Sequence, residues 1–544
     1  MQGKLDSFFS FKYIARLFYT LRYLKWQQFF FRVYYPIKYI FFSPKEIGDQ
    51  QLECTRSHQK ITFPSFLINQ QLFDAQDQSF TFLNQRKYFA GPIEWSFDKF
   101  GLLWKFHLHY LDWLNDANLS VDDRLVTLQS FVASYKKNYI FCHSYPASLR
   151  IVNVIKFLIE HEIKDDAIVQ NLYRQASRLS AFPEYEIRAN HLLQNGIALF
   201  WAGIYFGDPN FELIGKKILK KELKVQVLND GIHFEKSAAY QSIITKDLLG
   251  LIFLLRAKSI DNQFDHYLTQ HCTLLLSGLR KLLTPDGRYM NFGDANDEMS
   301  IPFLELLIVA QNLHININEL ELDESGYRFF GTVHFNLLFN LGNVPAVFQP
   351  GHAHADAFSF CLNSKKKQII VDRGVSTYEP SLLRLEEKST AAHNTISIEN
   401  ANTADVWSAF RMGKRAEIKL NTISERNLEC EHNAFQKCFG IIHSRKLEIQ
   451  EDLICIIDDL RGWNGQMAQL FLHFHPDVEL VQVGECWKVK DTEISIKIEN
   501  CNSFVDEYQY SIGFNKTRKA KRIIGDIQTT NIKTVIKFFD EKTY

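Results

Sequence analysis

The sequence predicts a multidomain α+β protein in which a helical half is followed by a large antiparallel β-sandwich. From about Gly101 to Asn312, apolar residues recur at the i, i+3, i+4, i+7 spacing of amphipathic helices, as in GLLWKFHLHYLDWLND and SLRIVNVIKFLIEH. After Ser325, apolar and polar residues alternate, as in KQIIVD, GIIHSRKLEIQ and EISIKIE, which is the period of β-strands. The change of period therefore divides the chain into two domains of different class.

Short connectors such as FGDPN and LTPDGR separate the helical stripes and favour antiparallel helical hairpins. Several hairpins in series must form a bundle, a solenoid or a closed toroid to bury their apolar faces. About ten strands without intervening helices indicate an antiparallel sandwich. We therefore predict a lead-in segment at 1–80, a helical domain at 81–325 and a β domain at 326–544.

Charge and cysteine content limit the function classes. Lys plus Arg and Asp plus Glu both number 62, so the formal charge is zero, which argues against a general nucleic-acid binder. The nine cysteines form no CxxC pair, which favours a reducing compartment over a disulfide framework. The N-terminus lacks the uninterrupted apolar run of a signal peptide, and no stretch reaches the length of a membrane span. We therefore expect a cytoplasmic protein.

The N-terminal segment is unusual in combining basic and aromatic residues. Up to Lys45 it carries a single acidic residue, Asp6, among many Lys, Arg, Phe and Tyr. Such a segment could lie on an anionic membrane surface as a peripheral contact. It could equally be an amphipathic helix that packs on the protein body, and the sequence leaves both interpretations open.

The stretch PGHAHADAFSF contains the densest group of chemically active residues. His352, His354 and Asp356 occupy alternate positions, so on a β-strand they would share one face. If the following hairpin turns around 364–366, an even register places Asp372 opposite Asp356 and diagonal to His354. His393 precedes the next predicted strand. The prediction is a metal site.

The predicted ligands of this site are His354, Asp372 and His393, a set that suits zinc. A metallo-β-lactamase would have a histidine where this chain has Ala357, and it would also show an alternating αβ pattern. A cupin would place an HxH motif in a small barrel and would not need the helical half. Neither family accounts for both halves of the chain.

Motifs spread over both halves indicate a third family. The helical half contains RANHLLQNGIALFWAG, DGIHFEKSAAYQ and NFGDAND, and the β half contains PGHAHADAFSF, IIVDRGVSTYEP and STAAHNTISI. With these motifs, from about Phe82 to His475, the chain resembles the heparinase II/III family of polysaccharide lyases. It is most similar to the unsecreted relatives encoded with surface-polysaccharide genes. The resemblance implies an incomplete (α/α) toroid followed by the β-sandwich.

The resemblance also implies a reaction, β-elimination on a uronic acid within a glycan. Such a site needs a group that neutralises the uronate carboxylate, a base for the C5 proton and an acid for the leaving oxygen. By position, Asn190 or His191 would neutralise the carboxylate, with Gln194 assisting one turn later. Tyr240 would act as the acid and, for some substrates, as the base. His352 would be the catalytic histidine.

Less specific interpretations remain for several of these residues. Tyr240 could be a buried helix tyrosine, Asn190 and His191 could cap a helix, and Asp294 could form a loop or the edge of the site. Glu386 and Glu387 stand where relatives tend to be basic or aromatic. This departure leaves the preferred substrate charge open.

The predicted function is that of a cytoplasmic, zinc-containing lyase-like enzyme linked to surface-polysaccharide metabolism. Its expected partner is a uronate-containing polysaccharide or a lipid-linked glycan, and no nucleic acid is expected. One alternative is a catalytically silent glycan-binding or scaffold protein. Another is a transferase or hydrolase that reuses the same cleft.

Overall fold

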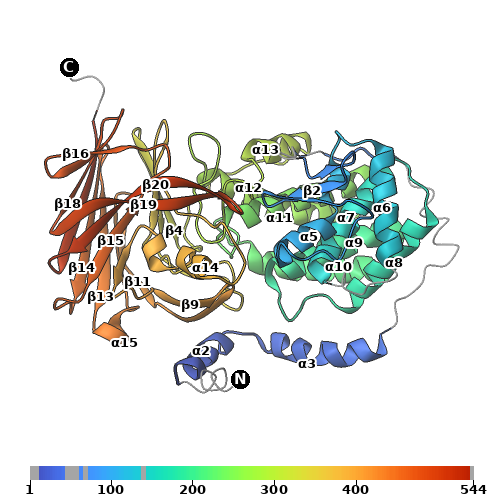
Figure 1. Ribbon diagram of the computed structural model, residues 1–544, viewed down its shortest axis with the longest axis horizontal. Coiled ribbons are helices and arrows are strands. Elements are labelled where there is room, and N and C mark those ends of the chain that lie inside the picture. Colours follow the sequence, from blue (N-terminus) through green and yellow to red (C-terminus); the bar gives the residue numbers. More distant parts are fainter. Residues whose placement is uncertain (1–10, 43–59, 65, 67–70, 136–142, 540–544) are drawn as a thin grey trace.

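The computed structural model describes residues 11–42, 60–64, 66, 71–135 and 143–539. A helical body and a β-rich body lie side by side, and they follow each other in the chain, as the blue-to-green and yellow-to-red colours of Figure 1 show. The helical body is an incomplete (α/α) toroid and the second body is an antiparallel β-sandwich. The predicted fold class is therefore confirmed.

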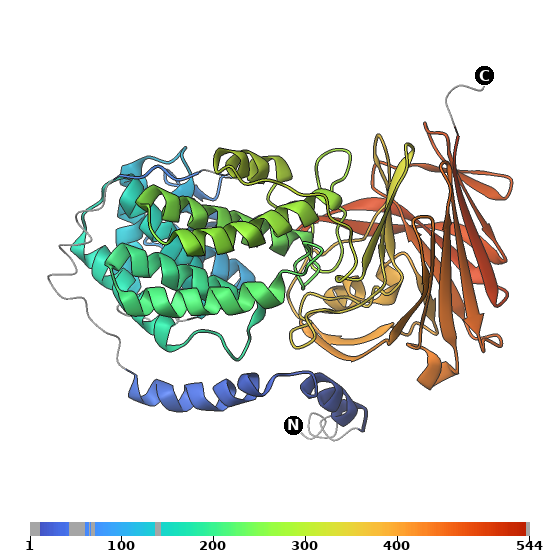
Figure 2. The same cartoon turned by 180° about the vertical axis from the view of Figure 1, so that it is seen from behind.

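The toroid consists of helices that run back and forth in consecutive hairpins, seen from behind in Figure 2. Their bounds are α5 (Leu102–Tyr110), α6 (Val121–Tyr135), α7 (Ser144–Glu160), α8 (Asp166–Ala181), α9 (Ala189–Phe206), α10 (Pro209–Gln226), α11 (Ala238–Lys258), α12 (Asn262–Lys281) and α13 (Phe303–Asn312). A small sheet of β1 (Phe73–Asp74), β2 (Ser79–Phe82) and β3 (Gln85–Tyr88) precedes them.

Helix ends in the toroid are defined by local sequence signals. The FGDPN connector ends α9 at Gly207, which adopts a left-handed conformation, and starts α10 with Asp208 as its N-cap and Pro209 as its first residue. Ser237 caps α11 by accepting a hydrogen bond from the Tyr240 amide. Most of α11 is buried, so its apolar sequence reflects a position in the toroid core.

The β domain contains three larger antiparallel sheets within the described part of the chain. One has the order β4-β5-β6-β7, a second β19-β20-β15-β8 and the third β11-β12-β13-β14-β21-β18-β17-β16. A bridge between Ile370 and Phe474 joins the first two. Buried Ile, Leu and Phe side chains from all three form one core, so the sheets pack face to face as a sandwich.

The strand bounds of the β domain are as follows. They are β4 (Tyr327–Gly331), β5 (Phe335–Asn340), β6 (Phe360–Ser364), β7 (Gln368–Ile370), β8 (Ile396–Ile398), β9 (Ala404–Ser408), β10 (Arg411–Arg415), β11 (Ile418–Ile423), β12 (Asn427–His432), β13 (Ile442–Ile449), β14 (Leu453–Arg461), β15 (Ala468–His473), β16 (Leu480–Val483), β17 (Cys486–Val489), β18 (Ile494–Glu499), β19 (Cys501–Gly513), β20 (Lys516–Ile527) and β21 (Asn531–Phe538). The short helix α14 (Leu382–Glu387) lies between β7 and β8, and α15 (Gln436–Phe439) between β12 and β13.

The prediction that His352, His354 and Asp356 share the face of a strand is wrong. The whole stretch before Phe360 is a loop, and β6 begins only at that residue. The loop contains a turn in which the Ala353 amide bonds to the Pro350 carbonyl. Phe358 then adopts a positive φ of 66°, which an extended strand does not allow. The two histidines are therefore placed by loop contacts.

The predicted hairpin register is also wrong. Leu362 pairs with Ile370, and a register shift separates this pair from that of Asn363 with Gln368. Asp372 lies beyond the end of β7 and does not pair with Asp356. The irregularity in the ladder changes which residues face each other, and this cannot be read from alternating hydrophobicity.

Two helices from the N-terminal segment lie along the outside of both bodies, at the lower edge of Figure 1. They are α2 (Phe11–Leu21) and α3 (Trp26–Phe41). α2 lies against β10 of the sandwich domain, and α3 lies against the loop between α8 and α9 of the toroid. The helical interpretation of this segment is correct for these residues.

Candidate active site

Two of the predicted catalytic residues, Tyr240 and His352, meet where the toroid contacts the sandwich. Tyr240 lies in the first turn of α11, and His352 lies in the loop before β6. Their rings lie 4.1 Å apart between centroids. The Tyr240 hydroxyl is 3.1 Å from that of Tyr378, which comes from the segment after β7. Burial raises the pKa of Tyr240 well above its usual range, so the phenol carries its proton at neutral pH.

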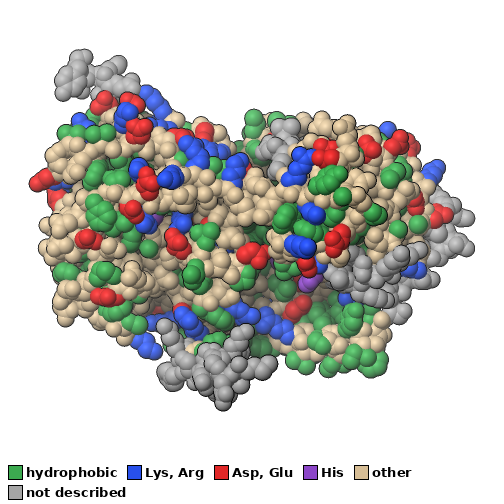
Figure 3. Space-filling view, in the orientation of Figure 1, with side chains coloured by type: hydrophobic (Ala, Val, Ile, Leu, Met, Phe, Trp, Pro, Cys, Tyr) green, Lys and Arg blue, Asp and Glu red, His purple; other side chains and the backbone are tan. Residues whose placement is uncertain are grey.

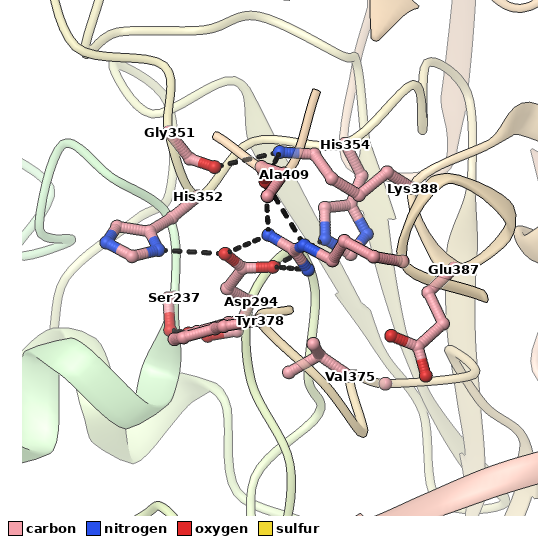
Figure 4. A network of polar contacts seen from close by, with 12 residues as sticks. Ser237, Asp294, Gly351, His352, His354, Val375, Tyr378, Glu387, Lys388 and Ala409 are labelled. Carbon is pink, nitrogen blue, oxygen red and sulfur yellow. Dashed lines mark hydrogen bonds and ion pairs between the residues drawn. The ribbon is translucent and has the colours of Figure 1, made fainter. Parts of the chain in front are cut away.

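A buried carboxylate, Asp294, holds His352 in a defined orientation. The His352 Nδ1–H donates to Asp294 Oδ2 at 2.8 Å, which leaves the Nε2 lone pair as an acceptor (Figure 4). Burial lowers the pKa of His352, although the Asp294 carboxylate opposes this. A neutral imidazole with a free Nε2 is the form that can accept a proton.

Asp294 is itself held by a buried cation. Arg384, from α14, donates to both carboxylate oxygens at 2.6 and 2.7 Å, and both side chains are fully buried. The positive charge of Arg384 holds the pKa of Asp294 well below its usual value, against the effect of burial. The loop approaches closely enough for this because Gly293 has no Cβ, which would lie 2.6 Å from the His352 carbonyl oxygen.

His354 shares the same carboxylate and faces His393. The His354 Nε2–H donates to Asp294 Oδ1 at 2.8 Å, and the His393 Nδ1–H donates to Asp372 Oδ2 at 2.7 Å. The two rings lie 5.3 Å apart between centroids. Each ring retains one buried nitrogen without a hydrogen-bond partner, Nδ1 of His354 and Nε2 of His393.

These two nitrogens fit a metal ion, because a buried imidazole lone pair without a donor is the group that zinc binds. Asp372 occupies the supporting position, since a carboxylate that accepts from a ligating histidine fixes its tautomer. As they stand, no three His, Cys, Asp or Glu side chains in the described residues form a metal-binding group. The three predicted ligands are therefore neighbours, but they are not arranged as three equivalent ligands.

The residues predicted to contact the uronate carboxylate lie at the start of α9. That helix begins at Ala189 with Arg188 as the N-cap, so Asn190 and His191 lie inside its first turn and are not caps. Asn190 is buried, and its side-chain amide makes no hydrogen bond within the described residues. Nδ1 of His191 lies within hydrogen-bonding distance of Glu184 Oε1, at 3.0 Å, and the His191 ring lies 4.3 Å from the Tyr145 ring between centroids. Of the two side chains, that of Asn190 therefore has fewer polar contacts within the described residues.

Gln194 has a partner of its own. Its side-chain amide donates to Asp247 Oδ2 at 2.5 Å, and the residue is buried one turn after Asn190. The predicted assistance to substrate binding would require Gln194 to use its carbonyl oxygen or to leave Asp247.

A buried acid that the sequence did not identify adjoins the site. Glu235 lines a small surface hollow that His352 and Asp356 also line. Both carboxyl oxygens are buried without a side-chain hydrogen-bond partner, and Oε2 lies 3.9 Å from Nδ1 of buried His233. Burial raises the pKa of Glu235 to about 8, and the Asn190 backbone partly offsets this. The buried carboxyl group of Glu235 is therefore neutral at neutral pH.

This pKa predicts a pH-dependent contribution to stability. The folded protein holds a proton on Glu235 that the unfolded chain loses above about pH 4, so stability falls as the pH rises towards 8. Glu235→Gln removes this titration. When the pH is raised from 5 to 8.5, the free energy of unfolding of the variant should increase by about 2–4 kcal/mol relative to that of the original protein. Denaturant unfolding at pH 5 and at pH 8.5 measures this, and Glu321→Gln is the matched control because the Glu321 side chain is 91% exposed.

Three further residues of the site were missed or underestimated. Asp294 was predicted only as a loop or site-edge residue, and neither Tyr378 nor Arg384 was identified. Glu386 and Glu387 have internal partners, since Glu386 accepts from Arg373 and buried Glu387 accepts from Ser376. Both carboxyl groups therefore have partners within the protein, although the Glu386 side chain is 59% exposed.

Comparisons with known proteins agree on one family. The model of the heparinase II/III N-terminus matches residues 149–309, and that of the heparinase II/III-like C-terminal domain matches residues 318–538. A heparin-sulfate lyase from Pedobacter heparinus is 22% identical over 263 residues, which is 43% of this chain and 39% of that protein. The aligned part thus spans about two fifths of that relative.

Solved structures show the same fold. A crystal structure of heparinase III has a TM-score of 0.69 at 17% identity and covers 89% of this chain and 88% of its own. A mutant heparan sulfate lyase from Pedobacter heparinus has a TM-score of 0.60 at 16% identity, covering 91% and 88%. A chondroitin AC lyase from Streptomyces coelicolor A3 has a TM-score of 0.51 at 9% identity, covering 90% and 79%. All three share the toroid-and-sandwich arrangement.

Proposed function

Because this chain belongs to the heparinase II/III family, we propose that it is a polysaccharide lyase that cleaves a uronic-acid-containing glycan by β-elimination. One observation carries the proposal. Tyr240 of the toroid lies against His352 of the β domain, and Asp294 holds the imidazole with its Nε2 free. A protonated phenol beside a neutral imidazole supplies the acid and the base that elimination requires.

In the proposed reaction, the two residues move protons at opposite ends of the bond change. His352 Nε2 takes the proton from C5 of the uronate, and the electron pair left on C5 forms the C4–C5 double bond. The C4–O4 bond breaks, and the leaving oxygen receives the Tyr240 hydroxyl proton. The products are a shortened glycan and a C4–C5 unsaturated uronate.

Removal of the C5 proton requires that the adjacent carboxylate be neutralised, since the carbanion would otherwise add to an existing negative charge. The Asn190 side-chain amide can donate to that carboxylate because no other group of the described residues occupies it. His191 remains the alternative to Asn190.

The direct test is incubation of the purified protein with a panel of uronate-containing polysaccharides. The proposal predicts an increase in ultraviolet absorbance from the conjugated unsaturated uronate with at least one glycan of the panel. Glycan binding without this absorbance would favour a silent binding or scaffold protein.

The zinc ion is a separate part of the proposal. His354 and His393 would hold it through their unpartnered nitrogens, and Asp372 would support His393 or join as a ligand. The ion would fix the loop beneath the cleft. Zinc in this position supplies structural rigidity when bound and carries no step of the elimination.

Metal analysis tests this assignment. We expect about one zinc per purified chain, and His354→Ala and His393→Ala should each lower both occupancy and melting temperature. Asp372→Ala should weaken zinc binding by roughly 10- to 100-fold, the usual effect of losing a supporting carboxylate. His352→Ala is the matched control, because it removes the neighbouring histidine but should retain zinc. A protein that is free of zinc and melts at the same temperature with added zinc would contradict the assignment.

The location and the form of the substrate also belong to the proposal. We place the protein in the cytoplasm, where it acts on a surface polysaccharide or its lipid-linked precursor and contacts the inner membrane face peripherally. The cysteines support a reducing compartment, since the seven in the described residues are all free. Subcellular fractionation with and without high salt tests the location.

A further inference from the structure

The outward face of the two N-terminal helices is apolar, the reverse of what a helix on a soluble surface normally presents. We call residues 11–42, which form α2, α3 and the turn between them, the strap. Its exposed large hydrophobic residues include Trp26, Val33, Ile37 and Ile40, at 71%, 67%, 54% and 75% exposure. In Figure 3 hydrophobic side chains gather along the lower edge, where α3 lies in Figure 1. Such a patch marks an interaction surface.

The inward face of the strap explains why the apolar face points outward. In α3, Gln28, Phe31, Tyr35 and Lys38 recur at helical spacing and face the toroid. The Tyr35 hydroxyl donates to the Pro183 carbonyl at 2.5 Å. Lys38 Nζ donates to the Ala181 carbonyl at 2.5 Å, and Phe31 stacks on Tyr185 at 4.7 Å. These contacts fix the rotation of the helix.

α2 is attached to the other body. Arg16 forms hydrogen bonds to both oxygens of Asp405 on β9, at 2.8–3.0 Å. Trp407 Nε1 donates to the Thr20 hydroxyl at 3.3 Å. Between the helices, the Arg415 guanidinium lies 4.1 Å from the Tyr23 ring. The strap is therefore bound to both domains through polar and aromatic contacts, while the large apolar residues on its outer face are not covered by any other described residue.

The charge of the strap selects the kind of partner. Residues 11–42 contain six Lys and Arg and no Asp or Glu. Arg22, Lys25 and Arg32 are exposed among the aromatic residues. A basic helix with exposed Trp, Phe and Ile and no acid matches the surface of an anionic bilayer, where the apolar residues enter the acyl boundary and the cations meet lipid phosphates.

We propose that the outer face of the strap docks this protein onto an anionic lipid bilayer. The strap holds the loop of residues 182–188, which leads directly into Asn190 and His191, and Gln28 lies within 3.5 Å of the Phe348 carbonyl, four residues before His352. Membrane attachment would thus fix both sides of the candidate site relative to the bilayer. The docking itself does not depend on the lyase chemistry.

Vesicle flotation tests the proposal without any glycan. The full-length protein should float with vesicles of phosphatidylcholine and phosphatidylglycerol, and much less with phosphatidylcholine alone or at high salt. Phe30→Asp/Ile37→Asp places two acids on the exposed face and should lower the partition coefficient at least about tenfold. Val126→Asp/Leu304→Asp is the matched control, because those toroid residues are each 65% exposed but lie outside the strap.

The melting temperature of each variant shows whether the fold is retained. Arg22→Glu/Arg32→Glu should remove the preference for anionic vesicles while the exposed aromatic residues are kept. No flotation of the original protein, or equal flotation of the Phe30→Asp/Ile37→Asp variant, would overturn the proposal. A dimer in light scattering that this variant converts to a monomer would also overturn it, because the face would then bind a second copy of the chain.

Discussion

Tyr240→Phe is expected to lower the rate of elimination at least about 100-fold, the usual contribution of one acid–base group. Phenylalanine keeps the ring that packs against His352 and removes only the hydroxyl, 3.1 Å from that of Tyr378. The substitution therefore removes only the proposed proton donor to the leaving oxygen of the glycan. The rate of unsaturated product formation, measured on the glycan that the original protein cleaves, gives the result.

Tyr378→Phe serves as the control for this variant. It removes the other hydroxyl of the same hydrogen bond, and Tyr378 is not assigned a proton transfer. The Tyr378 variant should therefore lose much less activity than the Tyr240 variant. Elimination by Tyr240→Phe at the original rate would show that the proton reaches the leaving oxygen from another group.

Asp294→Asn is expected to lower the free energy of unfolding by about 3–5 kcal/mol, because it leaves a fully buried Arg384 without its counter-charge. The same change removes the acceptor that sets the His352 tautomer, so activity should fall together with stability. Denaturant unfolding and product formation measure the two effects. This is the largest stability effect that we expect from a single conservative change in the site.

Glu319→Gln provides the comparison for this loss. Glu319 also pairs with an arginine, Arg280, but it is 67% exposed, so its loss should cost about 0–1 kcal/mol. In the double variant Asp294→Asn/Arg384→Met the buried cation is removed as well, and part of the stability should return. A loss below about 1 kcal/mol for Asp294→Asn would mean that Arg384 is stabilised by its contacts with the Ala409 carbonyl instead.

The division into two domains could be predicted because the apolar residues keep a helical spacing throughout one half of the chain and a strand spacing throughout the other. The helix stripes and the alternating strands depend on local spacing, and connectors such as FGDPN carry their own capping signals. The details of the central loop could not be predicted in this way. Phenylalanine is a residue type that favours strands, but the positive φ and the full burial of Phe358 reflect packing in the sandwich core.

The site residues that lie in recognisable motifs could be predicted, whereas those brought together from distant segments of the chain could not. His352 and Tyr240 lie in recognisable motifs, and the structure brings them into contact. Arg384 lies 90 residues from Asp294, and nothing in LLRLEE indicates that its guanidinium holds that carboxylate. Glu235 precedes Tyr240 by five residues, but the burial of its carboxyl group is a property of the folded site.

The most direct test of the central claim is cleavage in isotopically labelled water, followed by mass spectrometry of the two fragments. Elimination breaks the C4–O4 bond without adding water. The account therefore predicts that neither fragment acquires labelled oxygen during cleavage and that the fragment with the unsaturated uronate is lighter by one water than a hydrolysis product. Incorporation of labelled oxygen at the cleaved bond would contradict the account and would identify a hydrolase.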